Sequence, residues 1–192
     1  MEIVITDGYT LNPGDLNWKL LEQLGKLTIY ERTDPVALIE KCCHADIILT
    51  NKTVITKELI LAASNLKLIA VTATGYNNVD VSAAKAQGIT VCNVPAYGTF
   101  SVAQHTFALL LELVNHVGLN AASTAKGEWS KAKDWCYSLK PVVELKDKVM
   151  GIVGLGKIGK QVAIIAQAFG MKVIYTASKY RRSSFSPIVY SK

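Results

Sequence analysis

The feature that most constrains the fold is a glycine-rich segment in which an apolar run leads directly into a helical pattern. The glycines lie in Gly154-Leu-Gly-Lys-Ile-Gly159. Val149, Ile152 and Val153 before them predict a short buried strand, and the apolar spacing over 161–169 predicts a helix. Strand, glycine turn and helix, in this order, form the context in which the G-x-G-x-x-G pattern holds a dinucleotide. We therefore expect a dinucleotide site here.

Each glycine of this segment has its own expected role. Gly154 permits the tight turn, Gly156 lets the backbone approach a pyrophosphate, and Gly159 lets the helix lie close to its strand. The free N–H groups and the positive end of the helix dipole at Lys157 and Ile158 then face the phosphates. These five residues are the cofactor contacts predicted for the segment.

Composition narrows the class of protein. Half of the 192 residues are hydrophobic and 19% are charged, which allows a substantial core in one large or two small domains. The four cysteines form no C-x-x-C pair, which favours reduced thiols in the cytoplasm. The N-terminus lacks the regions of a signal peptide, and the most apolar helical run, 107–113, contains Glu112 and is too short for a bilayer. We expect a soluble cytoplasmic protein without a membrane segment.

The net charge of +6 does not predict nucleic-acid binding. Residues 178–192 hold four basic residues and no acidic one, so most of the excess charge lies at the end of the sequence. No basic stripe with interleaved aromatic residues runs along the rest, and we expect no nucleic-acid partner.

Short apolar runs alternate with helical patterns over residues 1–98. Predicted strands cover 3–6, 27–30, 47–49, 66–72 and 89–92, and predicted helices cover 16–24, 35–43, 57–63 and 79–87. Asp34 is a predicted N-cap with Pro35 at the first helical position, and Gly88 ends the last of these helices. This alternation predicts an α/β fold whose first domain is a flavodoxin-like parallel sheet.

Ligands of such sheets bind outside the carboxyl ends of the strands, where loops rich in Gly, Asn and Thr follow. The loop with Thr74, Gly75 and Tyr76 leads towards a helix, and its amides are candidates to hold a small carboxylate. Lys52, in another of these loops, adds a positive charge. The alternative is that Gly75 and the neighbouring asparagines only serve turn geometry.

A long helix is expected from Ser101, as its cap, to about Ala125. Its predicted buried stripe is Val102, Phe107, Leu110, Leu111, Val114 and Val117. The length suggests a helix that crosses between domains or forms an interface. The three histidines have no ligand spacing, and Cys42-Cys43-His44 lacks further ligands, so we expect no metal site.

A second strand of the dinucleotide unit is expected over 171–176. The acidic residue that would bind the ribose 2′-OH of NAD is absent there, because Ala177 is followed by a hydroxyl and basic residues. Ser178, Lys179 and Arg181 suit the 2′-phosphate of NADP instead. The alternative is that they form a solvated basic tail.

Taken together, these motifs resemble the D-isomer-specific 2-hydroxyacid dehydrogenases, in particular the glycerate dehydrogenase or hydroxypyruvate reductase branch. The matching segments occur in family order up to about residue 178: 8–15, 74–80, 93–98, 101–106, 129–131 and 151–159. The resemblance implies a substrate domain over 1–98 and a Rossmann coenzyme domain over 99–192.

The resemblance also implies residue roles and a reaction. Thr74 and Gly75 would line the substrate carboxylate, and Thr106 would join the glycine segment in contacting NAD or NADP. The long helix would help to build a homodimer. The reaction would be hydride transfer between the nicotinamide and a small 2-oxo or 2-hydroxy acid such as hydroxypyruvate, glycerate or glyoxylate.

The sequence also departs from the family pattern. The arginine and the glutamate–histidine pair that the family uses for catalysis have no match, so no catalytic residue is assigned. Only two Rossmann strands are expected, which leaves an unpaired edge and an uncovered apolar face, and 183–192 match nothing in the family. We expect a truncated coenzyme domain and no turnover by this chain alone. The alternatives are a non-catalytic fragment that dimerises with a full-length partner, or a carboxylate-binding domain.

Overall fold

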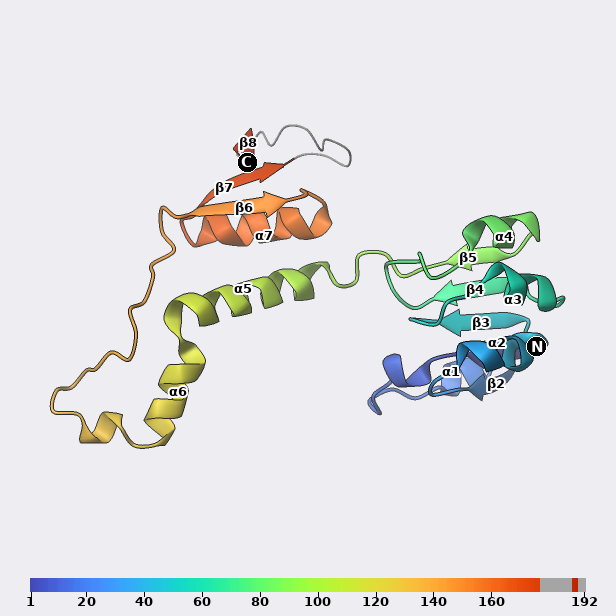
Figure 1. The fold of residues 1–192 in the computed structure, drawn as a ribbon, viewed down its shortest axis with the longest axis horizontal. Helices are drawn as coiled ribbons and strands as arrows, with labels where there is room; N and C mark the ends of the chain where they lie inside the picture. The colour runs from blue at the N-terminus through green and yellow to red at the C-terminus, as the bar shows by residue number, and fades with distance from the viewer. Residues whose placement is uncertain (177–187, 190–192) are drawn as a thin grey trace. The chain divides into compact units, whose positions relative to one another are not determined.

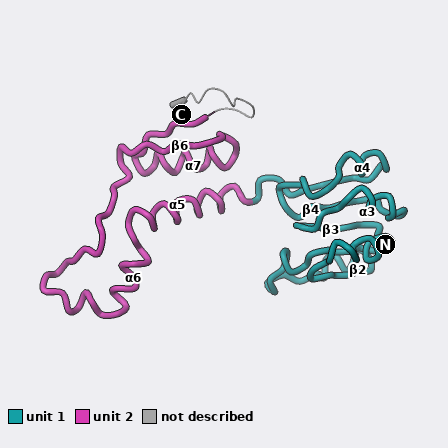
Figure 2. The backbone as a smooth tube through the Cα atoms, in the orientation of Figure 1, with its two compact units in different colours: residues 1–97 teal, residues 98–192 magenta. Residues whose placement is uncertain are grey.

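A computed structural model describes residues 1–176 and 188–189. The chain divides into two compact units, Met1–Tyr97 and Gly98–Lys192 (Figure 2), and the boundary lies one residue before the expected one. Each unit has its own hydrophobic core.

Unit 1 is built on a five-stranded parallel sheet with the order β2-β1-β3-β4-β5 (Figure 1). The strands are β1 (Glu2–Ile5), β2 (Lys26–Ile29), β3 (Ile47–Thr50), β4 (Leu68–Val71) and β5 (Thr90–Cys92). All four pairings in the sheet are parallel. This is the flavodoxin-like order, so the predicted fold class is confirmed and the carboxyl ends of all five strands share one edge.

The helices of unit 1 are short. They are η1 (Gly8–Thr10), α1 (Lys19–Glu22), η2 (Pro35–Ala37), α2 (Leu38–Cys42), α3 (Lys57–Ala62) and α4 (Val81–Ala86). The predicted cap is present, since the Asp34 side chain accepts the N–H of Val36 at 2.8 Å. The helices predicted over 16–24 and 79–87 were too long. A loop stabilised by the Asn12 side chain precedes α1, and Asp80 is the N-cap of α4, so that helix begins only at Val81.

The core of unit 1 follows the two-residue alternation of β3 and β4. Ile48 and Ile69 are fully buried on one face, with Val4 of β1 beside them in the same core cluster. Ile47 and Leu68, which point to the other face, are only half-buried. The sheet is therefore packed most densely on the face that carries Ile48 and Ile69.

Unit 2 begins with two helices where one was predicted. They are α5 (Thr99–Asn115) and α6 (Val117–Ala125), and His116 between them adopts the left-handed conformation with φ 53°. Gly98 is the N-cap of α5, so the prediction of Ser101 as the cap was wrong. The side chain of Glu112 accepts the N–H of Gly118 at 2.9 Å, which satisfies a donor in the first turn of α6.

The rest of unit 2 contains η3 (Trp129–Lys131), β6 (Val149–Val153), α7 (Lys157–Ala168), β7 (Lys172–Thr176) and β8 (Ile188–Val189). The strands β6 and β7 are parallel, with α7 as the crossover helix, which confirms a partial Rossmann fold. The short strand β8 pairs antiparallel with β7. The two expected Rossmann strands are therefore present, and the expectation that no further strand pairs with them was wrong.

Helices α5 and α7 pack against each other through small residues. Ala103 of α5 and Ala163 and Ala166 of α7 are fully buried, and the rings of Phe107 and Phe169 stack with centroids 5.4 Å apart. The predicted stripe was right at Phe107, and Leu110, Leu111 and Val114 also pack against this core. It was wrong at Val102 and at Val117, which are exposed. Alanine packing is hard to predict because alanine carries little hydrophobic signal on either face of a helix.

The predicted burial of β6 was wrong on one of its faces. Met150 and Ile152 pack on the helix side, whereas Val149 and Val153 on the other face are 58% and 82% exposed. The expected uncovered apolar face is therefore present. Within residues 1–176 and 188–189, no helix is long and apolar enough to span a membrane.

Candidate functional site

The glycine-rich turn connects β6 to α7 with the geometry expected of an anion-binding helix start. Gly154 has φ +92°, a conformation that favours glycine, and Gly156 is the extended N-cap of α7. Lys160 is the first residue of α7 whose N–H bonds back to the turn, to the Gly156 carbonyl at 2.9 Å. Within the described part of the chain, the amides of Lys157 and Ile158 have no acceptor. They are free for an anion at a helix of twelve residues.

The other glycines differ in what surrounds them. A Cβ on Gly159 would lie 2.3 Å from the carbonyl oxygen of Gly154 and 3.2 Å from the Ile152 side chain, so only glycine lets α7 sit this close to β6. A Cβ on Gly156 would meet nothing within 4 Å. Open space at Gly156 is what a bound pyrophosphate requires, and the turn therefore fits a dinucleotide.

The remaining predicted coenzyme residues are less defined. The hydroxyl of Thr106, on α5, donates to the Val102 carbonyl at 2.8 Å and keeps its acceptor lone pairs. Ser178, Lys179 and Arg181 lie outside the described residues.

In unit 1, the predicted substrate loop follows β4 and is pinned to the loop after β5. Thr74 donates through its hydroxyl to the Val94 carbonyl at 3.0 Å, and Asn93 donates to the Thr74 carbonyl at 2.8 Å. Among the described residues, no acceptor meets the N–H groups of Thr74, Gly75 and Tyr76, which are all exposed. The loop therefore presents three unpaired donors at the carboxyl edge of the sheet.

The loop differs from the prediction in one respect. Helix α4 starts at Val81, so Gly75 does not lie at a helix N-terminus, and donors for a carboxylate are loop amides rather than helix amides. A Cβ on Gly75 would lie 3.3 Å from the Asn77 side chain, a tight contact that is compatible with the turn-geometry alternative. Tyr76 borders a hollow of about 310 Å³ with Val91 and Asn93.

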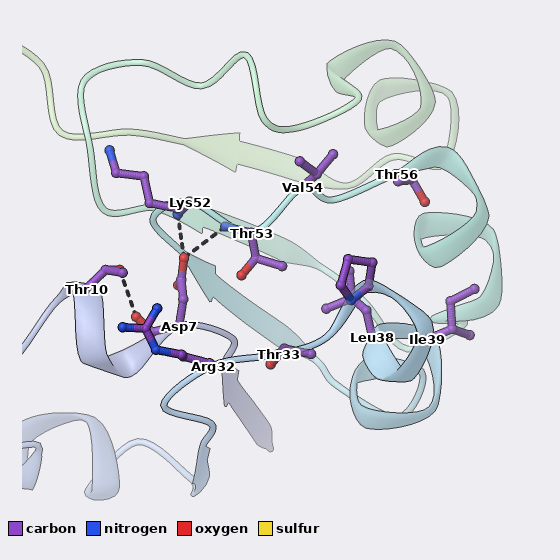
Figure 3. A pocket seen from close by; sticks show the side chains of 11 residues that line it. Asp7, Thr10, Arg32, Thr33, Leu38, Ile39, Lys52, Thr53, Val54 and Thr56 are labelled. Carbon is purple, nitrogen blue, oxygen red and sulfur yellow. Dashed lines mark hydrogen bonds between the residues drawn. The ribbon is translucent and has the colours of Figure 1, made fainter.

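Lys52 lies on a turn that the acidic residue Asp7 holds in place. The carboxyl group of Asp7, which follows β1, accepts backbone N–H bonds from Asn51, Lys52 and Thr53. Figure 3 shows the bonds from Lys52 and Thr53. Asp7 and Lys52 border an open hollow of about 490 Å³, together with Arg32 and an apolar wall that includes Leu38 and Val54. The guanidinium of Arg32 stacks 4.2 Å from the Tyr9 ring centroid.

Asp7 was not among the predicted site residues, although it lies in one of the loops expected at the carboxyl edge of the sheet. Its signal was an acidic residue directly after the first apolar strand, in a position where ligand loops begin. Its hydrogen-bond partners lie 44 to 46 residues further along the chain, beyond the reach of any local pattern.

The cysteines and histidines are not gathered into a site. All four cysteines are free, and in the described part of the chain no three potential metal ligands come together. Burial raises the pKa of the Cys42 thiol to about 11, with a smaller contribution from Cys43. His116 bonds through Nε2 to the Pro141 carbonyl at 3.1 Å, a contact that supports the loop after α6.

Comparison with known proteins gives the chain a family. Residues 3–184 match the model of the D-isomer specific 2-hydroxyacid dehydrogenase, catalytic domain. Hydroxypyruvate reductase of Blautia hydrogenotrophica is 49% identical over 183 residues, which cover 93% of this chain and 57% of the relative. The chain thus spans little more than half of this relative.

Two solved structures share the fold. An acyclic imino acid reductase in complex with NADPH and D-Arg has a TM-score of 0.74 at 31% identity, and the match covers 95% of this chain and 58% of the other. D-lactate dehydrogenase of Aquifex aeolicus, complexed with NAD and lactic acid, has a TM-score of 0.72 at 28% identity, with 95% and 53% covered. With the family match over nearly its whole length, this chain belongs to the D-isomer-specific 2-hydroxyacid dehydrogenases.

Proposed function

We propose that the chain binds a nicotinamide coenzyme at the turn between β6 and α7. The observation that carries this proposal is the pair of free amides at Lys157 and Ile158, above a Gly156 that leaves open space for the pyrophosphate. When bound, the nicotinamide accepts or gives a hydride. Gly154 and Gly159 shape the turn, and Thr106 of α5 is a further proposed contact.

The proposed substrate is a small 2-oxo or 2-hydroxy acid, such as hydroxypyruvate, glycerate or glyoxylate. The unpaired amides of Thr74, Gly75 and Tyr76 would bind its carboxylate, since backbone donors to an anion form short and strong hydrogen bonds. The ammonium group of Lys52 would add charge attraction. The name of the 49% identical relative supports hydroxypyruvate as the first compound to test.

The choice between NAD and NADP remains a proposal from the sequence alone. Ser178, Lys179 and Arg181 favour NADP, because no acidic residue stands where the 2′-OH of NAD would bind. The two structural neighbours differ in this respect, since one was solved with NADPH and the other with NAD.

We also propose a homodimer that uses α5 and α6. Apolar side chains remain exposed along these helices: Leu109, Leu113, Val117 and Leu119. Exposed apolar surface of this extent on neighbouring helices is typical of an interface. The four free cysteines support the cytoplasmic setting.

Fluorescence titration of the purified chain with NADPH and NADH tests the coenzyme proposal. We expect saturable binding, tighter for NADPH. We expect no steady oxidation of either coenzyme with hydroxypyruvate, because the sequence contains no match to the family's catalytic arginine or glutamate–histidine pair. A folded chain that binds neither coenzyme would refute coenzyme binding, and sustained turnover would refute the predicted inactivity.

Turnover and size-exclusion measurements with an added full-length relative separate the enzyme proposal from the alternative of a regulatory fragment. If the chain changes the turnover of a full-length relative, and size-exclusion chromatography shows a mixed complex, the chain acts through a partner. If coenzyme binds and no mixed complex forms, the fragment reading fails.

A further inference from the structure

The turn that carries Lys52 is held by hydrogen bonds to one buried acidic side chain, that of Asp7. Asp7 is only 5% exposed, and its carboxyl oxygens accept N–H bonds from Asn51 at 2.9 Å, from Thr53 at 2.9 Å, and from Lys52 between them. The hydroxyl of Thr6 lies 3.3 Å from the same group. Three consecutive amides around one anionic group form an arrangement that proteins otherwise use to hold phosphates and carboxylates.

A carbonyl group of the same turn, that of Thr53, also accepts hydrogen bonds. Thr50 donates through its hydroxyl to the Thr53 carbonyl at 2.9 Å, and the Asn78 side chain donates to the same carbonyl at 3.0 Å. Asn78 belongs to the loop that follows β4, which also contains Thr74 and Gly75. Hydrogen bonds therefore connect the Lys52 turn to both the end of β1 and the proposed carboxylate-binding loop.

The side chain of Lys52 is the part of the turn left free. It is exposed and extends away from Asp7 (Figure 3). The ion pairs found in the described residues are Lys26–Glu2 and Lys67–Asp46, and Lys52 takes part in neither. A fixed backbone favours anion binding by the free ammonium group, because less backbone freedom is lost when the anion arrives.

We propose that Asp7 is a positioning residue for substrate binding, which acts by fixing the backbone from which Lys52 reaches the substrate carboxylate. This inference rests on the proposed function of the Lys52 and Thr74–Tyr76 loops. A buried carboxyl group costs free energy unless it is hydrogen-bonded. Asp7 meets that cost only while Asn51, Lys52 and Thr53 keep this turn, so the buried group and the turn geometry depend on each other.

The test uses the whole chain with D-glycerate as the probe, followed by the chemical shifts of backbone amides in NMR spectra. The variants are Asp7→Asn, Lys52→Met and the double variant. Asp46→Asn is the matched control, because Asp46 also accepts a backbone N–H, from Glu2 at 2.8 Å, and a lysine ammonium, from Lys67 at 2.9 Å. It does so directly before β3, at the opposite end of that strand from the turn.

We expect Lys52→Met and Asp7→Asn each to weaken D-glycerate binding by about tenfold, the loss of one charged hydrogen bond. The double variant should bind no more weakly than Lys52→Met, because Asp7 acts through Lys52. Asp46→Asn should bind like the wild type. A folded Asp7→Asn variant with wild-type affinity, or losses that multiply in the double variant, would overturn the proposal.

Hydrogen exchange at the amides of Asn51, Lys52 and Thr53 provides a second readout that needs no ligand. We expect exchange to quicken more than tenfold in Asp7→Asn, and unchanged exchange would overturn the proposal. If the wild type binds no D-glycerate while exchange quickens, the proposed substrate is wrong and the turn-fixing role stands. If Asp7→Asn does not fold, Asp7→Glu replaces it, since one added methylene displaces the carboxyl group and should weaken Lys52-dependent binding.

Discussion

The last two glycines of the coenzyme turn, Gly156 and Gly159, should respond differently to alanine. In Gly159→Ala the new Cβ would lie 2.3 Å from the Gly154 carbonyl oxygen. Ordinary contact begins at 3.4 Å, so the start of α7 must move by about 1 Å away from β6. Overpacking of this kind costs about 1–3 kcal/mol of unfolding free energy. The shift also displaces the free amides of Lys157 and Ile158.

Gly156→Ala is the matched variant. Its new Cβ meets no protein atom within 4 Å, and φ −75° suits alanine, so the unfolding free energy should stay the same or rise by about 0.4–1 kcal/mol. The methyl group would nevertheless occupy the space proposed for the pyrophosphate. Loss of one hydrogen bond to a charged group, about 1.5–3 kcal/mol, predicts about 10- to 100-fold weaker NADH and NADPH binding in both variants.

Urea denaturation and coenzyme fluorescence titration on the same samples test this pair. Gly159→Ala should lose both stability and affinity, whereas Gly156→Ala should lose affinity alone. Wild-type affinity in Gly156→Ala would refute the proposed position of the pyrophosphate. Unchanged stability in Gly159→Ala would refute the close packing of α7 on β6.

Three further predictions concern unit 1. Asp34→Ala removes the side chain that accepts the Val36 N–H at 2.8 Å, and it should lower the unfolding free energy by about 1 kcal/mol in urea denaturation; no change would show that water replaces the cap. Because burial raises the Cys42 pKa from 9.0 to about 11, the folded state keeps its thiol proton longer than the unfolded state, so this contribution to stability should decline between pH 9 and about pH 11. At pH 8 a thiol reagent should label exposed Cys92 well before Cys42, and equal labelling rates would contradict the burial.

The sequence predicted those features whose causes are local. The roles of Gly154 and Gly159 follow from a strand, a turn and a helix within a dozen residues, and the Asp34 cap lies two residues from its donor. The left-handed His116 was not predicted, because the apolar pattern continues through the break, although Asn115 and Gly118 flank it. Its conformation depends on Glu112 and on the Pro141 carbonyl, a residue far beyond the break.

The sequence predicted the loops of the candidate site but not the hydrogen bonds that hold one of these loops in place. Lys52 and Gly75 lie in loops that a parallel sheet must place at its carboxyl edge, so their grouping followed from the fold class. Asp7 was not predicted as a site residue, because a carboxyl group after a strand is equally compatible with a solvated turn. Only the three-dimensional placement of β1 beside β3 brings it to the amides of 51–53.

The uncovered face of β6 leads to a prediction on association. Val149 and Val153 point to the exposed face and Met150 to the helix side of the same strand, so neighbouring residues should behave in opposite ways. Val149→Thr with Val153→Thr keeps the β-branched shape and should change the unfolding free energy by no more than about 0.5 kcal/mol, while association beyond a dimer decreases. Met150→Thr should cost about 1–3 kcal/mol, because it removes packing against α7. Sedimentation velocity over a concentration series and urea denaturation measure the two effects. If the variant with both threonines were as unstable as Met150→Thr, this face would be packed in solution. Threonine can destabilise a strand by that much only where the lost methyl groups were buried.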